Sequence, residues 1–186
     1  MNVELVTPTL DRLPHYLDAL QRGWSPDSVR GRVAAEEQLA AIETDAAGFV
    51  GRQTDPEAKG PPVTLPDGSK VACLPGRQFW IWDGEFCGVL GFRWQTGTAE
   101  LPARVLGHIG YTVVPWKRQR GCATQAVRAV LPHARAMGLP WVEITTDPHN
   151  LASQKVIAAN GGVLIETFTK PAAFGGAPGL RYRIPL

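Results

Sequence analysis

The 186-residue sequence lacks most features of secreted, metal-binding or nucleic-acid-binding proteins. Its three cysteines, Cys73, Cys87 and Cys122, form no C-x-x-C pair, which argues against a zinc site, and their odd number argues against a disulfide framework. The formal net charge is only +2, so no global positive field attracts a polyanion. We therefore expect no metal and no nucleic-acid partner. A short basic turn at 117–120 is the one feature that keeps nucleic-acid binding open as an alternative.

Long apolar runs are absent as well. The N-terminus has no signal-like apolar segment, and no run of about eighteen apolar residues occurs that would suggest a membrane span. Hydrophobic residues make up 44% and charged residues 19% of the chain, which is ordinary for a globular protein. The length allows a core without disulfides or metals. We expect a single domain over residues 1–186, located in the cytoplasm and without a membrane partner.

Hydrophobic periodicity and turn residues predict the order of the secondary structure elements. Hairpins come first, around the Asp83-Gly84 turn, and a β-α-β unit follows, so we expect a mixed sheet with helices on both faces. The glycine- and proline-rich segment 48–76 has little pattern and is predicted to be a long loop. The predicted strands are 3–6, 79–83, 86–95, 105–114, 141–146, 162–169 and 180–184, and the predicted helices are 10–20, 29–42, 123–134 and one starting at Asn150.

The most informative stretch runs from Val113 to Thr124, where an apolar strand leads through a basic turn into an amphipathic helix. The first amides of a helix have no partners within it, and the helix dipole adds positive charge, so such a turn binds phosphate. Gly121 lets the main chain approach an oxygen closely. Arg118 and Arg120 add charged donors beside it. The alternative is a solvated basic turn without a ligand.

Two common phosphate loops do not match this turn. No lysine follows Gly121, so the Walker pattern is absent, and no second glycine completes a dinucleotide fingerprint. The residues Arg118 to Ala123 instead read R-x-x-G-x-A. This pattern resembles the pyrophosphate loop of the GNAT acetyltransferase superfamily, Q/R-x-x-G-x-G/A.

Further motifs strengthen the resemblance to the GNAT superfamily, and in particular to a bacterial branch of predicted acetyltransferases. His108-Ile109-Gly110-Tyr111 precedes the turn, and Asn150 to Ser153 matches an N-x-x-[AS] helix start. The resemblance covers 79–186 well and the first 76 residues only loosely. It implies a GNAT-like α/β (α+β) fold, a mostly antiparallel twisted sheet of about seven strands with helices on both faces. It also implies acetyl-CoA as the acyl donor.

The resemblance further implies which residues hold the cofactor. The pantetheine arm is expected to pair with the main chain of Thr112, Val113 and Val114, and the turn is expected to bind the pyrophosphate. Asn150 and Ser153 fit a helix cap and also a cofactor contact. The turn residues concerned are Arg118, Gln119, Arg120, Gly121, Cys122, Ala123 and Thr124.

Catalytic roles are expected for three residues. His108 occupies a position where some superfamily members carry a glutamate base, and its alternative is a histidine packed on the sheet. Glu143 on the next strand is the rival base. Many members also carry a tyrosine seven residues after the asparagine, which protonates the departing thiolate. That position is Ile157 here, so either Tyr111 or Tyr182 serves, or the thiolate leaves unaided.

The acceptor is expected to be the primary amine of a small molecule or a peptide, attacking the thioester directly. Arg93 and Trp94 end a strand where they could line its pocket, Arg93 favouring a carboxylate or phosphate on the acceptor, although Trp94 also suits a core. A homodimer is possible. The rival function is a non-catalytic acyl-CoA-binding sensor or interaction module.

Overall fold

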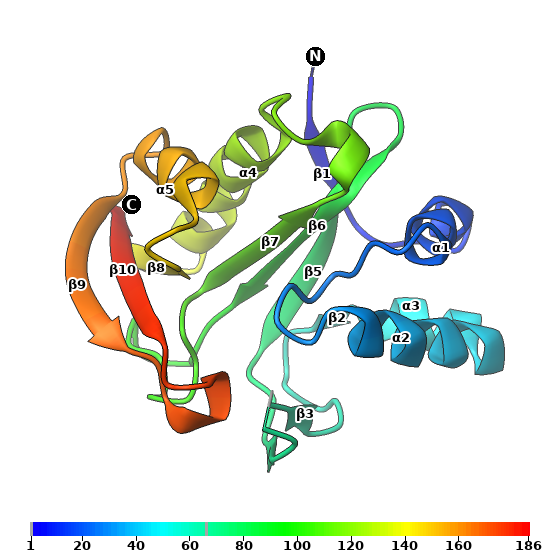
Figure 1. Cartoon of the computed structure of the whole chain (residues 1–186), viewed down its shortest axis with the longest axis horizontal. Helices are drawn as coiled ribbons and strands as arrows, with labels where there is room; N and C mark the ends of the chain where they lie inside the picture. The colour runs from blue at the N-terminus through cyan, green and yellow to red at the C-terminus, as the bar shows by residue number, and fades with distance from the viewer. Residues whose placement is uncertain (1, 66) are drawn as a thin grey trace.

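The structure is a computed structural model that describes residues 2–65 and 67–186. Its chain passes through a strand and three helices, then a meander of strands, then alternating strands and helices (Figure 1). One-turn 3-10 helices lie at Pro115–Lys117 and Ala172–Phe174. The other elements are β1 Glu4–Val6, α1 Leu13–Gln21, α2 Arg32–Thr44, α3 Ala46–Gly51, β2 Thr54–Asp55, β3 Val63–Thr64, β4 Lys70–Val71, β5 Gly76–Trp82, β6 Phe86–Arg93, β7 Ile109–Val113, α4 Cys122–Ala136, β8 Trp141–Thr146, α5 Leu151–Ala158, β9 Val163–Thr169 and β10 Pro178–Pro185.

The strands form two main sheets, and every strand pair in the described residues is antiparallel. One sheet has the order β1-β5-β6-β7, with β2 also paired to β5, and the other has the order β8-β10-β9. Strands β3 and β4 form a separate hairpin. The expected fold class is confirmed, but the sheet is divided, because β7 and β8 separate instead of pairing along their length (Figure 1).

Helices cover both faces of the larger sheet and bury two apolar cores. On one face, α4 packs side chains such as Val127 and Val130 against Leu90 and other residues of the strands. On the other face, α1, α2 and α3 enclose an aromatic cluster in which Tyr16 and Trp80 stack with ring centroids 5.2 Å apart. Each large buried side chain stabilises the fold by about 1.5–3 kcal/mol, so the two cores hold the helices firmly against the sheet. None of the helices in the described ranges is both long enough and apolar enough to cross a bilayer.

The segment 48–76 differs from the expected long loop. It contains most of α3 and the two-residue strands β2, β3 and β4, although Pro66 within it lies outside the described residues. Strands of two residues are too short to show an alternating pattern in the sequence. The prolines in the predicted helices are accommodated: Pro14 lies in the first turn of α1, where a missing N–H costs little, and α4 continues through Pro132.

His108 joins the two sheets at the end where they meet. Its backbone N–H donates to the carbonyl oxygen of Glu143 at 2.8 Å, and the N–H of Glu143 donates to Nδ1 of the imidazole at 3.0 Å. Gly107 allows this approach, because a Cβ there would lie 2.9 Å from the same carbonyl oxygen. Past this point, the described parts of β7 and β8 share no ladder hydrogen bond. The pair of sheets is therefore closed at one end and open at the other.

These hydrogen bonds also determine the protonation state of His108. Since Nδ1 accepts a hydrogen bond, the ring proton lies on Nε2, which is 3.1 Å from the carbonyl oxygen of Ala99. The side chain is fully buried, and this loss of solvation lowers the pKa of His108 to about 4. His108 directly precedes β7 rather than lying within a strand from 105. Its neutral ring connects β8 to the loop at Ala99.

Replacing His108 by asparagine should make the free energy of unfolding less dependent on pH in the acidic range. The pKa of His108 is lower in the folded protein than its ordinary value of 6.5, so its contribution to stability is complete above pH 6.5 and is lost as the pH falls toward 4. Asparagine keeps an acceptor near the position of Nδ1 but does not titrate. The free energy of unfolding of the wild type should exceed that of His108→Asn at pH 7, and this difference should decrease by up to about 3 kcal/mol as the pH falls from 6.5 toward 4.

Urea unfolding of both proteins between pH 7.5 and 4.5 measures this difference. His149→Asn is the matched control, because His149 is exposed and its side chain has no hydrogen bond in the described structure. A constant difference between wild type and His108→Asn over the whole range would contradict the neutral, hydrogen-bonded ring.

Candidate active site

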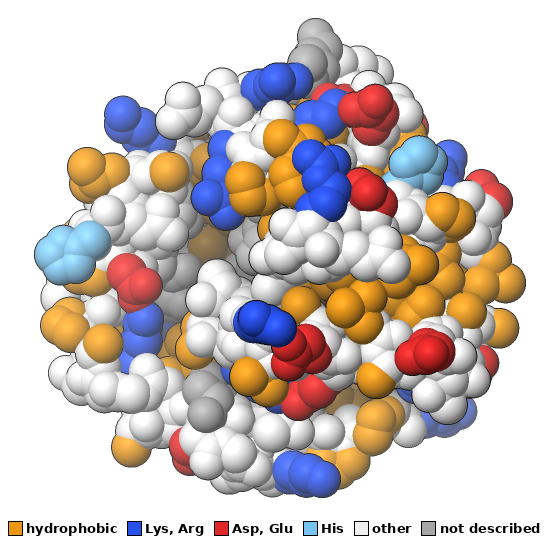
Figure 2. Space-filling model, turned by 45° about the vertical axis from the view of Figure 1, so that its right-hand side comes forward, with side chains coloured by type: hydrophobic (Ala, Val, Ile, Leu, Met, Phe, Trp, Pro, Cys, Tyr) orange, Lys and Arg blue, Asp and Glu red, His pale blue; other side chains and the backbone are white. Residues whose placement is uncertain are grey.

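The divergence of β7 from β8 creates a cleft of about 940 Å³, here called the interstrand cleft. It is lined by β7, by the turn before α4, by the end of β8 and by the first turns of α5. Figure 2 shows the surface hollowed left of centre, with basic side chains gathered near the upper rim of the hollow. The phosphate turn predicted from the sequence therefore opens onto the cleft between the two sheets.

The turn before α4 exposes a run of backbone donors. Gln119 and Gly121 both adopt left-handed conformations, with φ of 60° and 78°. The backbone N–H groups of 119–124 donate to no acceptor in the described chain, since the first bond into the turn is from Gln125 N–H to the Gly121 carbonyl oxygen. A φ of 78° favours glycine, which explains why Gly121 occurs here. Cys122, Ala123 and Thr124 form the first turn of α4 and line the cleft.

The basic side chains of this turn have different environments. Lys117 is buried and forms ion pairs with Asp83 at 2.9 Å and with Glu85 at 2.8 Å, so its charge is already neutralised. Nε of Arg118 donates to the carbonyl oxygen of Val113 at 3.2 Å. Arg120 is exposed and has no ion pair within the described residues. Of the basic side chains of this turn, only those of Arg118 and Arg120 therefore remain for a ligand. Because Lys117 is paired with carboxylates, it is not available for nucleic-acid binding by residues 117–120.

The free edge of β7 faces the interstrand cleft. The N–H of Val114 donates to the carbonyl oxygen of Cys87 on the β6 side, and the carbonyl oxygen of His108 accepts from Arg93 on that same side. Because alternate residues of a strand face opposite edges, Thr112 belongs with Val114 on the paired edge. Of the three residues expected to hold pantetheine through their main chains, only Val113 directs its N–H and C=O toward the free edge, as Tyr111 also does, although Thr112 is among the residues that line the cleft.

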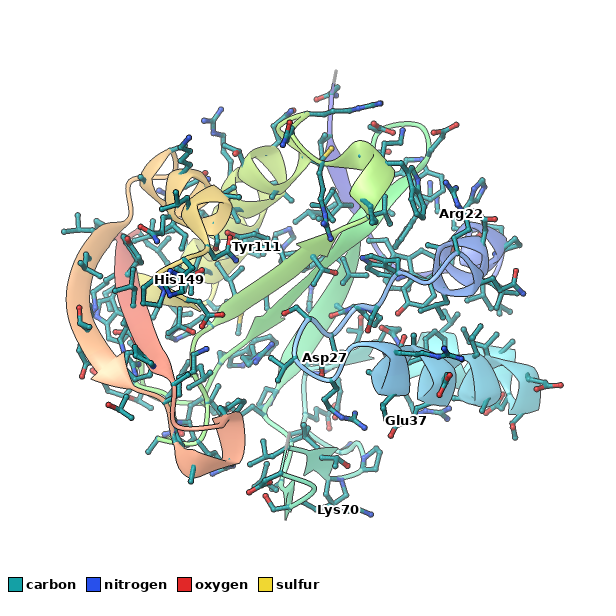
Figure 3. The ribbon with its side chains drawn as sticks, viewed as in Figure 1. Arg22, Asp27, Glu37, Lys70, Tyr111 and His149 are labelled. Carbon is teal, nitrogen blue, oxygen red and sulfur yellow. The ribbon has the colours of Figure 1, made fainter. Side chains whose placement is uncertain are left out.

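The start of α5 meets β7 through side chains. The side chain of Asn150 caps the helix by accepting from the Ser153 N–H at 3.0 Å, and the hydroxyl of Ser153 is 2.8 Å from that of Tyr111. Figure 3 shows Tyr111 between β7 and α5. Burial raises the pKa of the Tyr111 phenol to about 12, so it stays protonated at neutral pH. Ile157, at the position of the missing tyrosine, is fully buried.

Glu143 lies in a tightly paired environment. Its buried carboxylate contacts Arg181 at 2.9 Å and Arg183 at 2.7 Å, and its main chain forms the link with His108. Both carboxylate oxygens therefore already accept charged hydrogen bonds. Neither Glu143 nor His108 is among the residues that line the cleft. The side chains of both residues expected as bases are instead engaged in hydrogen bonds that hold the structure around the site.

A second cavity of about 920 Å³, here called the side cavity, lies among β2, the β3–β4 hairpin and the start of β5. It meets the interstrand cleft at a common wall. Arg93, which the sequence analysis considered as a possible acceptor contact, belongs to this wall. Trp94 does not line either cavity, because its ring is buried beside Phe92 with centroids 5.4 Å apart. The residues common to both cavities are Asp27, Val29, Gln78, Gly91, Arg93 and Leu106.

The sequence analysis missed Asp27, which is the carboxylate in this common wall. Figure 3 shows it on the segment between α1 and α2, which lies over the strands of the larger sheet. Its Oδ1 accepts from the N–H groups of Val29 and Arg30, while Oδ2 has no partner in the described chain. Ser25-Pro26-Asp27 looks like an ordinary turn before a helix, so only the packing of that segment shows that Asp27 reaches the cavities.

Solved structures of similar fold come from acetyltransferases. RimL, a ribosomal L7/L12 alpha-N-protein acetyltransferase in complex with coenzyme A, aligns with a TM-score of 0.63 and 17% identity over 100% of this chain and 95% of its own. An acetyltransferase from Salmonella typhimurium that modifies the N-terminal serine of L7/L12 aligns with a TM-score of 0.61 and 18% identity over 100% and 96% of the two chains. The microcin C7 self-immunity acetyltransferase MccE, in complex with acetyl-CoA and AMP, aligns with a TM-score of 0.60 and 13% identity over 99% of this chain and 92% of its own.

At these identities, the solved structures establish the fold. No curated protein matches the chain in sequence. A family model described as an acetyltransferase (GNAT) domain matches residues 38–163, which is more than half of the chain and includes the turn, β7, β8 and α5. The chain therefore belongs to the GNAT acetyltransferase family and is an acyltransferase with acetyl-CoA as its acyl donor.

Proposed function

We propose that this protein transfers the acetyl group of acetyl-CoA to a primary amine by direct attack within a ternary complex, with the whole chain acting as one catalytic domain. The observation that carries the proposal is the common wall of the two cavities. A donor in the interstrand cleft and an acceptor in the side cavity would meet there without any movement of either sheet. Such positioning alone supplies a large part of the rate enhancement of a two-substrate reaction.

Acetyl-CoA is held by its pyrophosphate and its pantetheine arm. The unpaired amides of 119–124 and the dipole of α4 bind the pyrophosphate, with Arg118 and Arg120 as charged donors. The pantetheine arm pairs with the free edge of β7 at Tyr111 and Val113, as an added strand would. This use of the edge satisfies the backbone groups that the divergence of β8 leaves without a partner strand, apart from the Val113 carbonyl oxygen, which accepts from Nε of Arg118.

Tyr111 is the proposed acid for the departing thiolate. Its hydroxyl lies beside Ser153 at the start of α5 and lines the interstrand cleft. Its raised pKa keeps the phenol protonated until a base appears. Tyr182, the other tyrosine considered, donates to Gln154 at 3.4 Å and does not line the cleft. The geometry therefore favours Tyr111 over Tyr182.

Asp27 is the proposed group that receives the proton of the amine, directly or through a water molecule. It replaces His108 and Glu143 in this role, because both of those side chains are occupied by structural hydrogen bonds. The free Oδ2 of Asp27 and its place in the common wall give it access to an acceptor in the side cavity. The residual positive charge of the amine is attracted to this carboxylate.

Direct transfer is proposed because no cysteine lies in the common wall. Cys87 and Cys122 are buried, and Cys73 in the side cavity is hydrogen bonded to Asp55 and to the carbonyl oxygen of Gly60. An acyl-enzyme would need a nucleophile beside the thioester. The acceptor class includes small amines and peptide N-termini, and the Salmonella typhimurium enzyme of similar fold modifies an N-terminal serine.

A panel of amines assayed for release of free thiol tests the proposal. Steady release with at least one amine, and intersecting lines when both substrates are varied, are the expected results. Parallel lines would indicate an acyl-enzyme. Tight acetyl-CoA binding with no turnover on any amine or peptide would instead support a non-catalytic sensor.

Replacing Gly121 by valine should weaken acetyl-CoA binding. A valine at φ 78° is strained, and relief of this strain rotates the amides of the turn away from the pyrophosphate. Loss of one or two charge-assisted hydrogen bonds predicts a rise in Kd of about tenfold to a hundredfold or more, measured by calorimetry.

Gly138→Val is the matched control for this variant. Gly138 has φ 74°, a Cβ added there would meet no atom within 4 Å, and the residue lies at the far end of α4, outside both cavities. Both variants should lose similar thermal stability, but only Gly121→Val should lose acetyl-CoA affinity. Equal affinities in the two variants would refute the assignment of the turn.

Replacing Tyr111 by phenylalanine should lower kcat by about tenfold to a hundredfold, because a positioned general acid contributes at least that much. The Kd for acetyl-CoA should stay close to that of the wild type. Tyr182→Phe removes a hydroxyl of similar burial outside the cleft and should leave kcat unchanged. If the two variants lose the same activity, the thiolate leaves without help from Tyr111.

A further inference from the structure

The side cavity carries an excess of positive charge that its own carboxylates do not balance. Six basic residues but only two acidic ones line it. Asp55 accepts through both of its oxygens, from the N–H groups of Lys59 and Gly60, whereas Asp27 accepts through Oδ1 alone, from the amides of its own turn, and keeps Oδ2 free of partners in the described chain. The basic residues are Arg30, Arg52, Lys59, Arg77, Arg93 and Arg104.

Half of these cations are neutralised by carboxylates that lie outside the cavity. Arg30 pairs with Glu37, and Arg52 pairs with Asp45 at 3.6 Å. Lys59 pairs with Glu57. By contrast, Arg93 has no salt bridge and no side-chain hydrogen bond in residues 2–65 and 67–186. Its guanidinium is therefore available to an anion.

Arg93 lines both cavities. Gly91 and Gly110 are cross-strand partners in β6 and β7, and a Cβ on either would lie 3.6 or 3.5 Å from Nη2 of Arg93. The guanidinium thus lies over a floor made of two residues without side chains. Gln78 borders the same floor, because its Oε1 would be 3.1 Å from a Cβ on Gly91. The open floor leaves the donors of Arg93 accessible from the side cavity.

Arg104 adds a second cation without a carboxylate partner. Its Nη2 donates to the carbonyl oxygen of Ala72 at 3.3 Å, and its Nε is buried without a hydrogen bond in the described chain. A guanidinium in this state keeps its full charge, since arginine does not deprotonate in proteins. With three of the six cations paired outside the cavity, Arg77, Arg93 and Arg104 remain against two carboxylates, and this balance favours an acceptor that carries an anion.

We propose that the acceptor is zwitterionic: beside its amine it carries a carboxylate or a phosphate, which Arg93 binds through its guanidinium fork. This inference rests on the proposed function and deepens it. The anion docks at Arg93 in the common wall, and the amine is then held near Asp27 in the same wall. Arginine is suited to this task because its planar donors match both carboxylate and phosphate oxygens. Polyamines and other purely cationic amines are disfavoured.

Matched pairs of amines test this inference by the kcat/KM for thiol release. An amino acid is compared with its amide, and phosphoethanolamine with ethanolamine, so that the two pairs separate carboxylate from phosphate; spermidine represents polycations. Arg93→Gln should lower kcat/KM for the anionic member of the preferred pair by about tenfold to a hundredfold, mainly through KM. For the member that lacks the anionic group, kcat/KM should change little, and the Kd for acetyl-CoA should not change.

Arg128→Gln is the control, because Arg128 is exposed on α4 and lines neither cavity. If wild type and Arg93→Gln both acetylate spermidine and the amines without an anionic group as efficiently as the zwitterionic amines, the zwitterion is excluded while the acetyltransferase function stands. If no amine is acetylated, the proposed function fails. The anion site at Arg93 is then tested by the change in melting temperature that inorganic phosphate causes at saturating coenzyme A. A smaller shift in Arg93→Gln than in wild type supports it, and equal shifts overturn it.

Discussion

Two hydrogen bonds between His108 and Glu143 hold β7 and β8 together at one end, and past them the strands run apart. This divergence leaves one edge of β7 without a partner strand, so that only the Val113 carbonyl oxygen on it accepts a hydrogen bond within the described chain, from Arg118, and opens the interstrand cleft beside that edge. Unpaired backbone groups in a sheet interior are costly unless a ligand or water satisfies them. These two hydrogen bonds thus mark the closed end of the cleft, and the strand edge beyond them is open to a ligand.

The phosphate turn depends on this arrangement for its direction. Left-handed conformations at Gln119 and Gly121 present a run of amides, but any helix start with a tight turn would do so. What makes the turn useful is that α4 packs on β5 and β6 through a continuous apolar core, which aims its N-terminus at the mouth of the cleft. Apolar packing therefore places the positive end of the helix dipole beside the free edge of β7.

Charge is distributed differently in the two halves of the site. In the framework, ionisable groups are neutralised in pairs: Lys117 with Asp83, and Glu143 with two arginines. In the common wall, Arg93 and Asp27 keep donors and an acceptor that no other described residue uses. Buried charges that stabilise a fold are paired, whereas unpaired charges beside a cavity are suited to bind a ligand. This contrast separates structural from functional residues of the same types.

Those parts of the protein that depend on neighbours along the chain could be predicted from the sequence. The hairpin at Asp83-Gly84, the helix cap at Asn150 and the turn at Gly121 are local, and the structure has each element within a few residues of its predicted place. Residues whose partners are distant in the chain acquire their roles only through tertiary packing. Contacts with residues far along the chain decide whether His108 has a free nitrogen and toward which strand Val114 directs its backbone groups. Such contacts also decide whether Asp27 reaches a cavity. No local sequence pattern encodes them.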